Sequence, residues 1–258
     1  MKFYKYTGAG NDFIIFNDFN NEIPDFSEKQ IQFLCDRHFG IGADGIMILK
    51  KSKVLDFDMD YYNADGSGGT MCGNGGRCIV AFARKIGIIK NHTKFLASDG
   101  IHEAFINQRN IVKLKMIDTD KPKPVGNNFY AYTGSPHYVI FSDEIESLDV
   151  FNEGRKIRYS EKYKENGINV NFVKIEKNHS ISIRTYERGV EGETLACGTG
   201  SVAAALICAE INKFCSGEVI VHTKGGLLKV SFIEKNDRYE DIWLTGPADF
   251  IFEGEIEI

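Results

Sequence analysis

The sequence predicts an α+β protein made of two similar units in one chain. Two Cys-Gly-x-Gly turns, at residues 72–75 (CGNG) and 197–200 (CGTG), each run directly into a small, apolar segment typical of a helix. Each predicted helix lies between groups of strand-like segments, so the order strands, helix, strands occurs twice. Both helices are apolar nearly all round, which predicts that each is buried within its own sheet.

The composition limits the partners and the compartment of the protein. The 258 residues suffice for one large domain or two of ordinary size, with enough apolar side chains for real cores. The net charge of −5 and the lack of any basic run argue against nucleic acid and against an anionic membrane as partners. The N-terminal residues lack the apolar core of a signal peptide, and no segment is long enough to span a membrane. We therefore expect a soluble cytoplasmic protein.

The first half of the chain is rich in short strand patterns. Residues 55–61 (LDFDMDY) alternate strictly between apolar and polar side chains, which is typical of a half-buried strand. The helix after the first Cys-Gly turn is expected to end near residue 86. The strands expected in this half lie at residues 3–6, 13–16, 46–49, 55–61, 95–97, 101–106 and 111–116.

A further helix is predicted shortly before residue 40. Ser27 and Gln30 form a capping box, and apolar positions at helical spacing continue the pattern through Cys35 to His38. We expect Cys35 to be a core residue of this helix. His38 is expected to be a packed structural histidine and not a catalytic one.

Residues 40–45 (GIGADG) match the dinucleotide-binding fingerprint by letter. That fingerprint requires a helix directly after the glycines. The next residues, 46–49 (IMIL), instead read as a strand. We therefore reject a Rossmann fold.

A linker is predicted at residues 118–128, which hold two prolines, several turn-forming residues and few apolar ones. The linker divides the chain into an N-terminal domain of residues 1–117 and a C-terminal domain of residues 118–246. A last strand at about 247–258 can pack back onto the first domain. The elements expected in the second half are strands at 129–132, 138–141, 170–175, 181–186, 219–222, 227–233, 241–244 and 250–256, and helices at about 150–158 and from 197 to about 211.

The six cysteines are expected to be mostly reduced, because disulfides are rare in cytoplasmic proteins of this length. No C-x-x-C motif and no Cys/His cluster at zinc spacing occurs, so we expect no structural metal. Cys78 and Cys208 lie within the two apolar helices and are expected to be small core residues. Cys215 follows the second helix and is given no role.

The two remaining cysteines, Cys72 and Cys197, each lie at the start of a predicted helix. Unpaired N–H groups and the helix dipole at such a site favour a thiolate and can bind a carboxylate. A pair of such thiols suits the inversion of an acidic carbon, with a base on one face and an acid on the other. The glycine N–H groups would hold the substrate carboxylate and stabilise the carbanion, so that no cofactor is needed.

Other functions fit the paired thiols less well. A cysteine hydrolase needs one Cys with a His base, and two matched cysteines do not fit it. A tyrosine-phosphatase loop needs five residues between Cys and Arg, whereas Cys72 and Arg77 have four between them. Two alternatives stay open: both cysteines could be buried helix-start residues without chemistry, or they could form a disulfide in a non-catalytic, redox-sensitive binding protein.

Several motifs together resemble diaminopimelate epimerase, in the family order and over nearly the whole chain. They are residues 8–13 (GAGNDF), 36–45 (DRHFGIGADG), 63–66 (NADG), 71–78 (MCGNGGRC), 187–189 (ERG) and 197–200 (CGTG). The resemblance implies an epimerase independent of pyridoxal phosphate that interconverts LL- and meso-2,6-diaminopimelate, on the bacterial route to lysine and peptidoglycan precursors. It also implies two α+β domains, each a curled, mostly antiparallel sheet or barrel around a central helix. The active site would lie in the cleft between the domains, and the protein would be a homodimer.

The resemblance also assigns roles to individual residues. Cys72 and Cys197 would be the two acid/base thiols, and His137 and Glu187 would lie near the reacting amine and tune them. Arg188 would grip the distal carboxylate with two hydrogen bonds. The residues implied in substrate binding are Asn11, Asn63, Gly73, Asn74, Asn169, Glu187, Arg188, Gly198 and Thr199, and no metal ligands are implied.

The chain departs from the family pattern at two positions. Ser135 stands where many members have Asn before Pro-His, so this contact is weakened or made by a hydroxyl group. Gly45 stands where many have Gln, so one side-chain contact is missing.

Proline racemase and hydroxyproline epimerase also use a pair of thiols and are the nearest alternative. Against them, Gly-Asn follows Cys72 where Gly-His is usual, and Arg188 calls for a second carboxylate.

Overall fold

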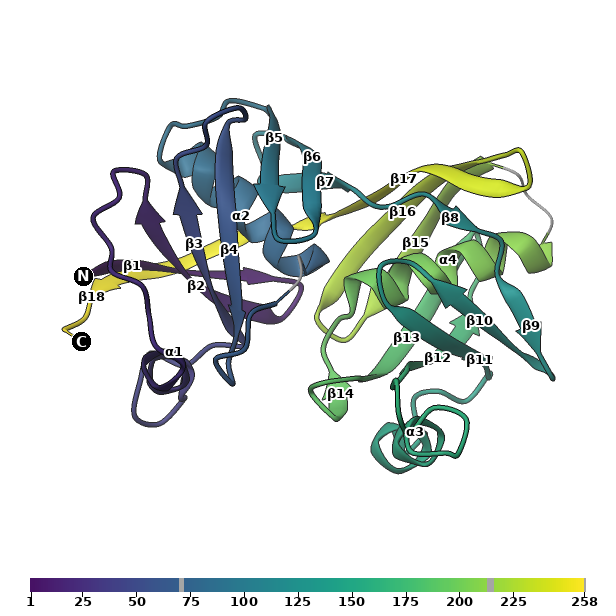
Figure 1. Cartoon of the computed structure of the whole chain (residues 1–258). Helices are drawn as coiled ribbons and strands as arrows, with labels where there is room; N and C mark the ends of the chain where they lie inside the picture. Colours follow the sequence, from purple (N-terminus) through teal and green to yellow (C-terminus); the bar gives the residue numbers. More distant parts are fainter. Residues whose placement is uncertain (70–71, 213–215, 258) are drawn as a thin grey trace. The chain divides into compact units, whose positions relative to one another are not determined.

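The computed structural model describes residues 1–69, 72–212 and 216–257 (Figure 1). The chain divides into two compact units. The first unit comprises Met1–Leu114 and Gly246–Ile258, and the second comprises Lys115–Thr245. Cys215 lies outside the described residues.

In the described part of the first unit, eight strands form the sheet. They are β1 (Lys2–Gly8), β2 (Asn11–Asp18), β3 (Gly45–Lys50), β4 (Phe57–Asn63), β5 (His92–Ala97), β6 (Gly100–Ile106), β7 (Ile111–Lys115) and β18 (Asp249–Glu255). The order across the sheet is β18-β1-β2-β3-β4-β5-β6-β7. Among the pairings of this sheet in the described residues, β2·β3 and β4·β5 are parallel and the others are antiparallel. Because β18 pairs with β1, the two chain ends lie side by side (Figure 1).

The helix α2 (Gly73–Lys85) lies at the centre of this sheet and contacts β1, β2, β3, β6 and β18. All of its residues from Gly73 to Ala83 are buried, as the apolar pattern predicted. Cys78 is one of these core residues. Cys72, the residue before the helix, is partly buried, so the thiol is the accessible group at this end of α2.

The short helix α1 (Glu28–Cys35) packs against β3. The predicted capping box of Ser27 and Gln30 is confirmed, and Cys35 is buried. The helix does not reach His38, so the expectation of a packed histidine is wrong. Asp36 adopts an extended conformation, and its carboxylate accepts hydrogen bonds from the backbone N–H of His38 and of Phe39. This local turn competes with the helix and leaves His38 exposed.

The second unit has ten strands among its described residues. They are β8 (Thr119–Asp120), β9 (Lys123–Val125), β10 (Asn128–Tyr132), β11 (Pro136–Phe141), β12 (Asn169–Ile175), β13 (Ser180–Glu187), β14 (Gly192–Thr194), β15 (Ser216–Thr223), β16 (Gly226–Lys235) and β17 (Arg238–Pro247). Their order is β9-β10-β11-β12-β13-β15-β16-β17-β8, with β14 on β13. The parallel pairs are β11·β12 and β13·β15. The helix α4 (Gly198–Asn212) lies at the centre and contacts six of these strands, and α3 (Val150–Arg158) covers β12 and β13.

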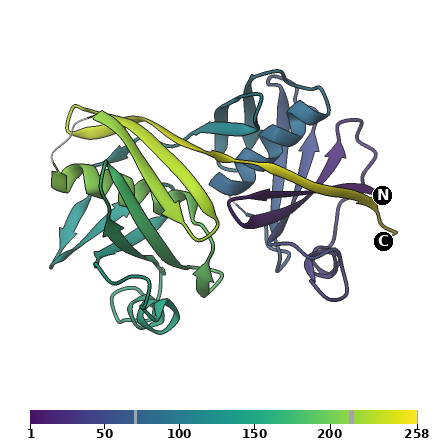
Figure 2. The same ribbon diagram turned by 180° about the vertical axis from the view of Figure 1, so that it is seen from behind.

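Both units follow one plan. From β1 to β7 the successive pairings are antiparallel, parallel, antiparallel, parallel, antiparallel and antiparallel. From β10 through β13 and β15 to β17 the same six relations occur in the same order. Figure 2 shows α2 and α4 each among the strands of its own unit. The predicted fold class, two similar α+β units with a curled, mostly antiparallel sheet around a central helix, is confirmed.

The segment expected to be a linker carries two short strands. β8 pairs with β17, and β9 pairs with β10. Pro124 lies within β9, which is an edge strand, and an edge position tolerates a residue without an N–H group. The prolines therefore read as breakers in the sequence, although the segment completes the sheet.

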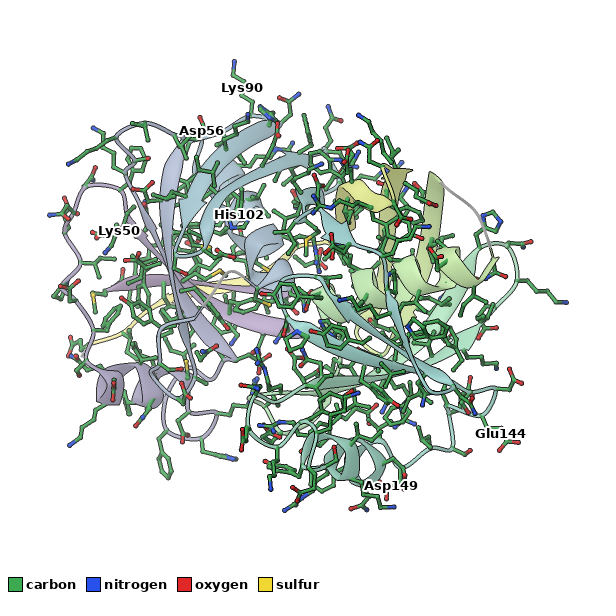
Figure 3. The ribbon with its side chains drawn as sticks, turned by 45° about the vertical axis from the view of Figure 1, so that its right-hand side comes forward. Lys50, Asp56, Lys90, His102, Glu144 and Asp149 are labelled. Carbon is green, nitrogen blue, oxygen red and sulfur yellow. The ribbon has the colours of Figure 1, made fainter. Side chains whose placement is uncertain are left out.

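Charged side chains lie on the outside of each unit. Asp56 and Lys90 are exposed in the first unit, and Glu144 and Asp149 are exposed in the second (Figure 3). Within the described ranges, no helix is both long enough and apolar enough to cross a membrane.

Candidate functional site

The first candidate thiol, Cys72, is the N-cap residue of α2. Its backbone is extended (φ −89°, ψ 131°), and its side chain makes no capping hydrogen bond to the helix. The helix is held instead through the backbone, where the N–H of Gly76 donates to the Cys72 carbonyl at 2.7 Å. The sulfur therefore lies at the positive end of the helix dipole, together with the first-turn N–H groups of Gly73 and Asn74.

Asn74 is joined to Asn11 by a chain of side-chain hydrogen bonds at the start of α2. Arg77 Nη2 donates to Asn74 Oδ1 at 3.1 Å, and Asn74 Nδ2 donates to Asn11 Oδ1 at 2.9 Å. Asn11 Nδ2 then donates to Asp44 Oδ2 at 2.5 Å. β1 can approach the helix this closely because Gly8 has no side chain; a Cβ there would lie 2.8 Å from the Asn74 carbonyl oxygen. The structure thus brings two predicted binding residues together.

Arg77 is a cation that is fully buried beside this chain. Its other donors reach the carbonyl oxygens of Gly73 at 3.1 Å and of Pro247 at 3.2 Å, which are neutral acceptors. Burial lowers the pKa of Arg77, and Cys72 is among the groups that interact electrostatically with it. No carboxylate in the described part of the chain forms an ion pair with Arg77. A buried positive charge at a helix start favours an anion there, either a thiolate or a bound carboxylate.

Asn63 lies at the end of β4 and pairs with Gly45 of β3. Its amide Nδ2 donates to Ser67 Oγ at 3.0 Å within the turn that follows. Gly45 lacks a side chain for a steric reason: a Cβ would lie 2.7 Å from the Tyr61 ring and 2.6 Å from the Tyr62 carbonyl oxygen. The Tyr61 ring thus fills the space that a longer side chain at position 45 would need.

The second candidate thiol, Cys197, precedes α4 and is 6% exposed. Both the N–H and the hydroxyl group of Ser201 donate to the Cys197 carbonyl at 2.9 Å. The Cys197 sulfur lies 3.6 Å from the Thr199 hydroxyl oxygen. Thr199 is held in turn by Thr133, whose hydroxyl group donates to the Thr199 carbonyl at 2.8 Å.

His137 lies beside Thr199 and is fully buried. Its Nε2 is 3.0 Å from Thr199 Oγ1, and its Nδ1 is 3.1 Å from Asn171 Nδ2. Burial lowers the pKa of His137 to about 3, and the positive charge of Arg188 acts in the same direction. The imidazole is therefore neutral at ordinary working pH, and it reaches Cys197 through Thr199.

Asn169 connects Ser135 to Arg188. Its amide Nδ2 donates to Ser135 Oγ at 2.8 Å and to the Pro136 carbonyl at 3.2 Å, and its Oδ1 accepts from the Arg188 backbone N–H at 2.8 Å. Ser135 therefore holds Asn169 through its hydroxyl group. The Arg188 side chain is exposed, donates to the Asn166 carbonyl at 3.0 Å, and forms no ion pair with any residue that the structure describes.

Glu187 is partly buried at the end of β13 and accepts a 2.7 Å hydrogen bond from the Thr194 hydroxyl group. In the first unit, contacts join Asn74 and Asn11 beside Cys72 and Gly73, whereas Asn63 makes a separate set of bonds. In the second unit, contacts join Cys197, Thr199 and His137 next to Gly198, and a separate set joins Asn169 to Arg188. The hydrogen bond of Glu187 to Thr194 belongs to neither of these two sets.

Four residues that hold the predicted ones were not expected from the sequence. They are Asp44, Arg77, Asn171 and Thr185, whose hydroxyl group donates to Asn171 Oδ1 at 3.0 Å. Asn171 had a usable signal, because it follows Asn169 by two positions in a strand and so shares its inward face. Asp44 and Arg77 lie within recognised motifs, but their partners are distant in sequence, and nothing local predicts those bonds.

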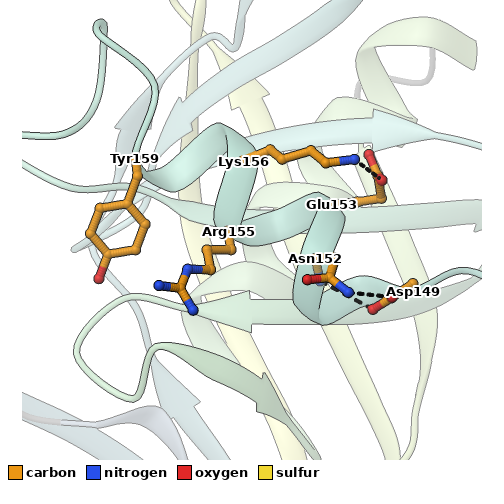
Figure 4. Close-up of a pocket in the computed structure, with 6 residues that line it drawn as sticks. All are labelled: Asp149, Asn152, Glu153, Arg155, Lys156 and Tyr159. Atoms are coloured by element: carbon orange, nitrogen blue, oxygen red, sulfur yellow. Dashed lines mark hydrogen bonds and ion pairs between the residues drawn. The ribbon is translucent and has the colours of Figure 1, made fainter.

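A separate hollow of about 620 Å³ lies along α3 in the second unit. Figure 4 shows that the polar groups lining it mostly satisfy one another: Asn152 donates to Asp149 at 2.6 Å, and Lys156 pairs with Glu153 at 2.6 Å. No predicted site residue lines it. Within residues 1–69, 72–212 and 216–257, no three His, Cys, Asp or Glu side chains are grouped so as to hold a metal ion.

The two units also resemble known proteins in three dimensions. A phenazine biosynthesis protein of the PhzF family from Bacillus anthracis has a TM-score of 0.78 and 16% identity, covering 100% of this chain and 99% of that chain. A probable proline racemase from Agrobacterium radiobacter has a TM-score of 0.72 and 14% identity, covering 100% and 93%. At such identities these likenesses establish the fold alone.

Sequence comparison is more specific. A family model described as diaminopimelate epimerase matches residues 3–122 and 129–251. A diaminopimelate epimerase of Flavobacterium psychrophilum is 49% identical, covering 99% of this chain and 100% of the relative. One of Chlorobaculum tepidum is 42% identical, covering 98% and 100%. From these matches over essentially its whole length, the chain belongs to the diaminopimelate epimerase family.

Proposed function

We propose that this protein interconverts LL- and meso-2,6-diaminopimelate in lysine biosynthesis. The observation that carries the proposal is the placement of Cys72 and Cys197 at the starts of two buried helices, in two units built on one plan. The relatives that match the full chain are named for this reaction. The membership of the family and the paired thiols thus support the same chemistry.

The reaction needs one base and one acid. One sulfur, as a thiolate, takes the proton from the α-carbon, and the C–H electron pair shifts onto that carbon and its carboxylate. The other sulfur, as a thiol, then gives its proton to the opposite face of the carbon. The product has the same atoms in the inverted configuration, and the two sulfurs have exchanged thiol and thiolate states. The scheme requires both sulfurs to reach the same α-carbon.

The helix starts supply the electrostatic stabilisation. The N–H groups of Gly73 and Asn74, and those of Gly198 and Thr199, would bind the carboxylate next to the reacting carbon. Negative charge grows on this carboxylate as the proton leaves. Fixed N–H donors therefore stabilise the transition state more than the bound substrate, which lowers the barrier. The buried charge of Arg77 adds to this effect in the first unit.

The substrate's second amino-acid end requires its own partners. Arg188 is exposed, and its backbone is held by Asn169, so the guanidinium is available for a bidentate bond to a carboxylate. Asn11, Asn63 and Glu187 would bind the polar groups at this end and at the reacting amine. A proline-type substrate has one carboxylate and would leave Arg188 without such a partner, which favours the diamino diacid.

We also propose a homodimer in the cytoplasm. The edge strand β18 exposes three consecutive apolar side chains, those of Phe250, Ile251 and Phe252. Exposed apolar edge strands are typical protein contact sites. None of the five cysteines in the described part of the chain forms a disulfide, which suits a reducing compartment.

The substrate assignment can be tested by chiral chromatography with reduced protein. LL-Diaminopimelate is expected to approach an equilibrium mixture with the meso form, while L-proline and trans-4-hydroxy-L-proline stay unchanged. Inversion of either proline compound with no action on diaminopimelate would show that the substrate is a proline-type amino acid. Inactivity on all three in the presence of reductant would support a binding protein.

A further inference from the structure

A buried chain of hydrogen bonds in the second unit ends at the Cys197 sulfur. The Thr185 hydroxyl group donates to Asn171 Oδ1 at 3.0 Å, and Asn171 Nδ2 lies 3.1 Å from His137 Nδ1. His137 Nε2 lies 3.0 Å from Thr199 Oγ1, which is 3.6 Å from Cys197 Sγ. All of these residues except Thr199 are at least nine-tenths buried. The chain from Thr185 to His137 is therefore shielded from water, which would otherwise compete for its bonds, and only Thr199 is partly exposed.

The direction of each bond follows from one fixed acceptor. Asn171 Nδ2 also lies 3.2 Å from the Tyr138 carbonyl oxygen, which can only accept a hydrogen bond. This contact requires the NH₂ group of Asn171 to face Tyr138 and His137, and its carbonyl oxygen to face the Thr185 hydroxyl group. Consequently Nδ1 of His137 must accept from Asn171.

The remaining two bonds are then determined. A neutral imidazole that accepts at Nδ1 carries its proton at Nε2, and this N–H donates to the Thr199 oxygen. The Thr199 hydroxyl group, having accepted this bond, has its own proton left to donate to the neighbouring Cys197 sulfur. A donor aimed at sulfur stabilises the thiolate more than the thiol.

The first unit shows that the fold itself does not require this polar chain. The third residue after each thiol is a glycine, and a Cβ on Gly200 would lie 2.6 Å from Asn171 Oδ1. A Cβ on Gly75 would instead lie 3.2 Å from the Met47 sulfur and 3.5 Å from the Phe13 ring. The matching place in the first unit is therefore filled by apolar side chains.

Register supports the same correspondence. Asn171 pairs with Thr185 in the second unit, and Met47 pairs with Tyr61 in the first. Burying amide and imidazole groups is costly unless every bond is made, and apolar packing at this place is demonstrably compatible with the fold. The polar chain is thus better explained by an effect on Cys197 than by packing.

We propose that Asn171, held by Thr185, is a positioning residue that fixes His137 and so directs the Thr199 hydroxyl proton onto the Cys197 sulfur. The role rests on the proposed function only in that Cys197 serves there as an acid and base. The two thiols are then tuned by different means, Cys197 by a neutral chain of donors and Cys72 by the buried cation Arg77.

The proposal is tested by the pH dependence of Cys197 alkylation, followed with iodoacetamide and peptide mass spectrometry, which requires no turnover. Asn171→Leu is expected to raise the midpoint pH of Cys197 alkylation by about one unit, a roughly tenfold slower reaction below the midpoint. The isosteric Thr185→Val is expected to shift it less, in the same direction. Thr93→Val is the matched control, because the buried Thr93 hydroxyl group has no hydrogen-bond partner among the residues that the structure describes.

A double-mutant cycle separates positioning from a merely structural role. If Asn171 acts through the Thr199 hydroxyl group, Asn171→Leu has no further effect on the midpoint in a Thr199→Val background. An equal shift in that background would overturn the proposal, as would an unchanged midpoint in both Asn171→Leu and Thr185→Val. Should Asn171→Leu fail to fold, Thr185→Val decides alone. If the wild type lacked epimerase activity but the Cys197 alkylation midpoints shifted as expected, this would count against the proposed function and not against the role of Asn171.

Discussion

Arg77 is the buried charge that distinguishes the surroundings of Cys72 from those of Cys197. It is fully buried among neutral acceptors, and it orients Asn74, which in turn holds Asn11. In Arg77→Met both effects are lost, so the midpoint pH of Cys72 alkylation is expected to rise by about one unit, and kcat to fall. Arg84→Met, in the last turn of the same helix, is the control. An unshifted Cys72 midpoint in a folded Arg77→Met protein would show that the cation has only a structural role.

The lowered pKa of the buried His137 is expected to make the stability of the fold depend on pH. Its pKa is about 3 in the folded protein, whereas its ordinary value is 6.5. Between these two pH values the unfolded chain binds a proton at this residue and the folded protein does not. The free energy of unfolding is therefore expected to decrease by about 1.4 kcal/mol for each pH unit below 6.5. Above pH 6.5 the contribution is constant.

Urea unfolding at pH 7.5, 5.5 and 4.5 measures this effect. His137→Gln keeps a side-chain donor but has no group that titrates, so its free energy of unfolding is expected to fall less on acidification than that of the wild type. Parallel losses in the two proteins would mean that His137 is not held neutral by burial.

At the scale of elements, the packing of β3 against β4 depends on the absence of a side chain at position 45. A Cβ there would lie within 2.7 Å of the Tyr61 ring and 2.6 Å of a backbone oxygen. Gly45→Ala is therefore expected to cost about 1–3 kcal/mol of unfolding free energy, measured by urea titration. Gly68→Ala should be nearly neutral, because a Cβ at Gly68 would have no atom of the described residues beyond its chain neighbours within 4 Å. Equal stability of the two variants would contradict this account.

The same scale shows what local sequence could and could not predict. The two central helices were predictable, because a glycine turn followed by an all-apolar segment has few other solutions. The end of α1 was not, because the Asp36 carboxylate captures two N–H groups and stops the helix before His38. β9 was hidden by Pro124, which is tolerated because the strand lies at an edge of the sheet.

The candidate site divides in the same way. Cys72 and Cys197 could be selected from their glycine turns alone, whereas most of the proposed binding residues could be named only through the family resemblance. Asn171 and Thr185 pair across β12 and β13, and Arg77 bonds to Pro247, 170 residues away. Such partners are set by sheet register and topology, which no short window of sequence contains.

At the scale of the whole molecule, the duplicated plan explains why the thiols come as a pair. One half-site could bind a carboxylate and hold a proton, but inversion needs a second proton carrier. Divergence between the halves, with Arg77 in one and a neutral chain of donors in the other, gives each thiol its own environment.

The proposed homodimer is checked by light scattering on the purified protein. The chain has a mass of 29.0 kDa, and the exposed apolar side chains of β18 lead us to expect a particle of twice this mass at micromolar concentration. Ile251→Lys would introduce a charge into that surface and is expected to give the single-chain mass. A wild-type mass of 29.0 kDa would show that the protein is a monomer under these conditions and would contradict the proposed dimer.

In the proposed reaction, Cys72 and Cys197 act as a pair on one α-carbon of diaminopimelate. The most direct test is proton NMR of LL-diaminopimelate with the reduced protein in heavy water. We expect formation of the meso isomer with deuterium at the inverted α-carbon, and loss of this conversion in folded Cys72→Ala and Cys197→Ala proteins. Full conversion by either variant, or none by the reduced wild type, would contradict the proposed reaction.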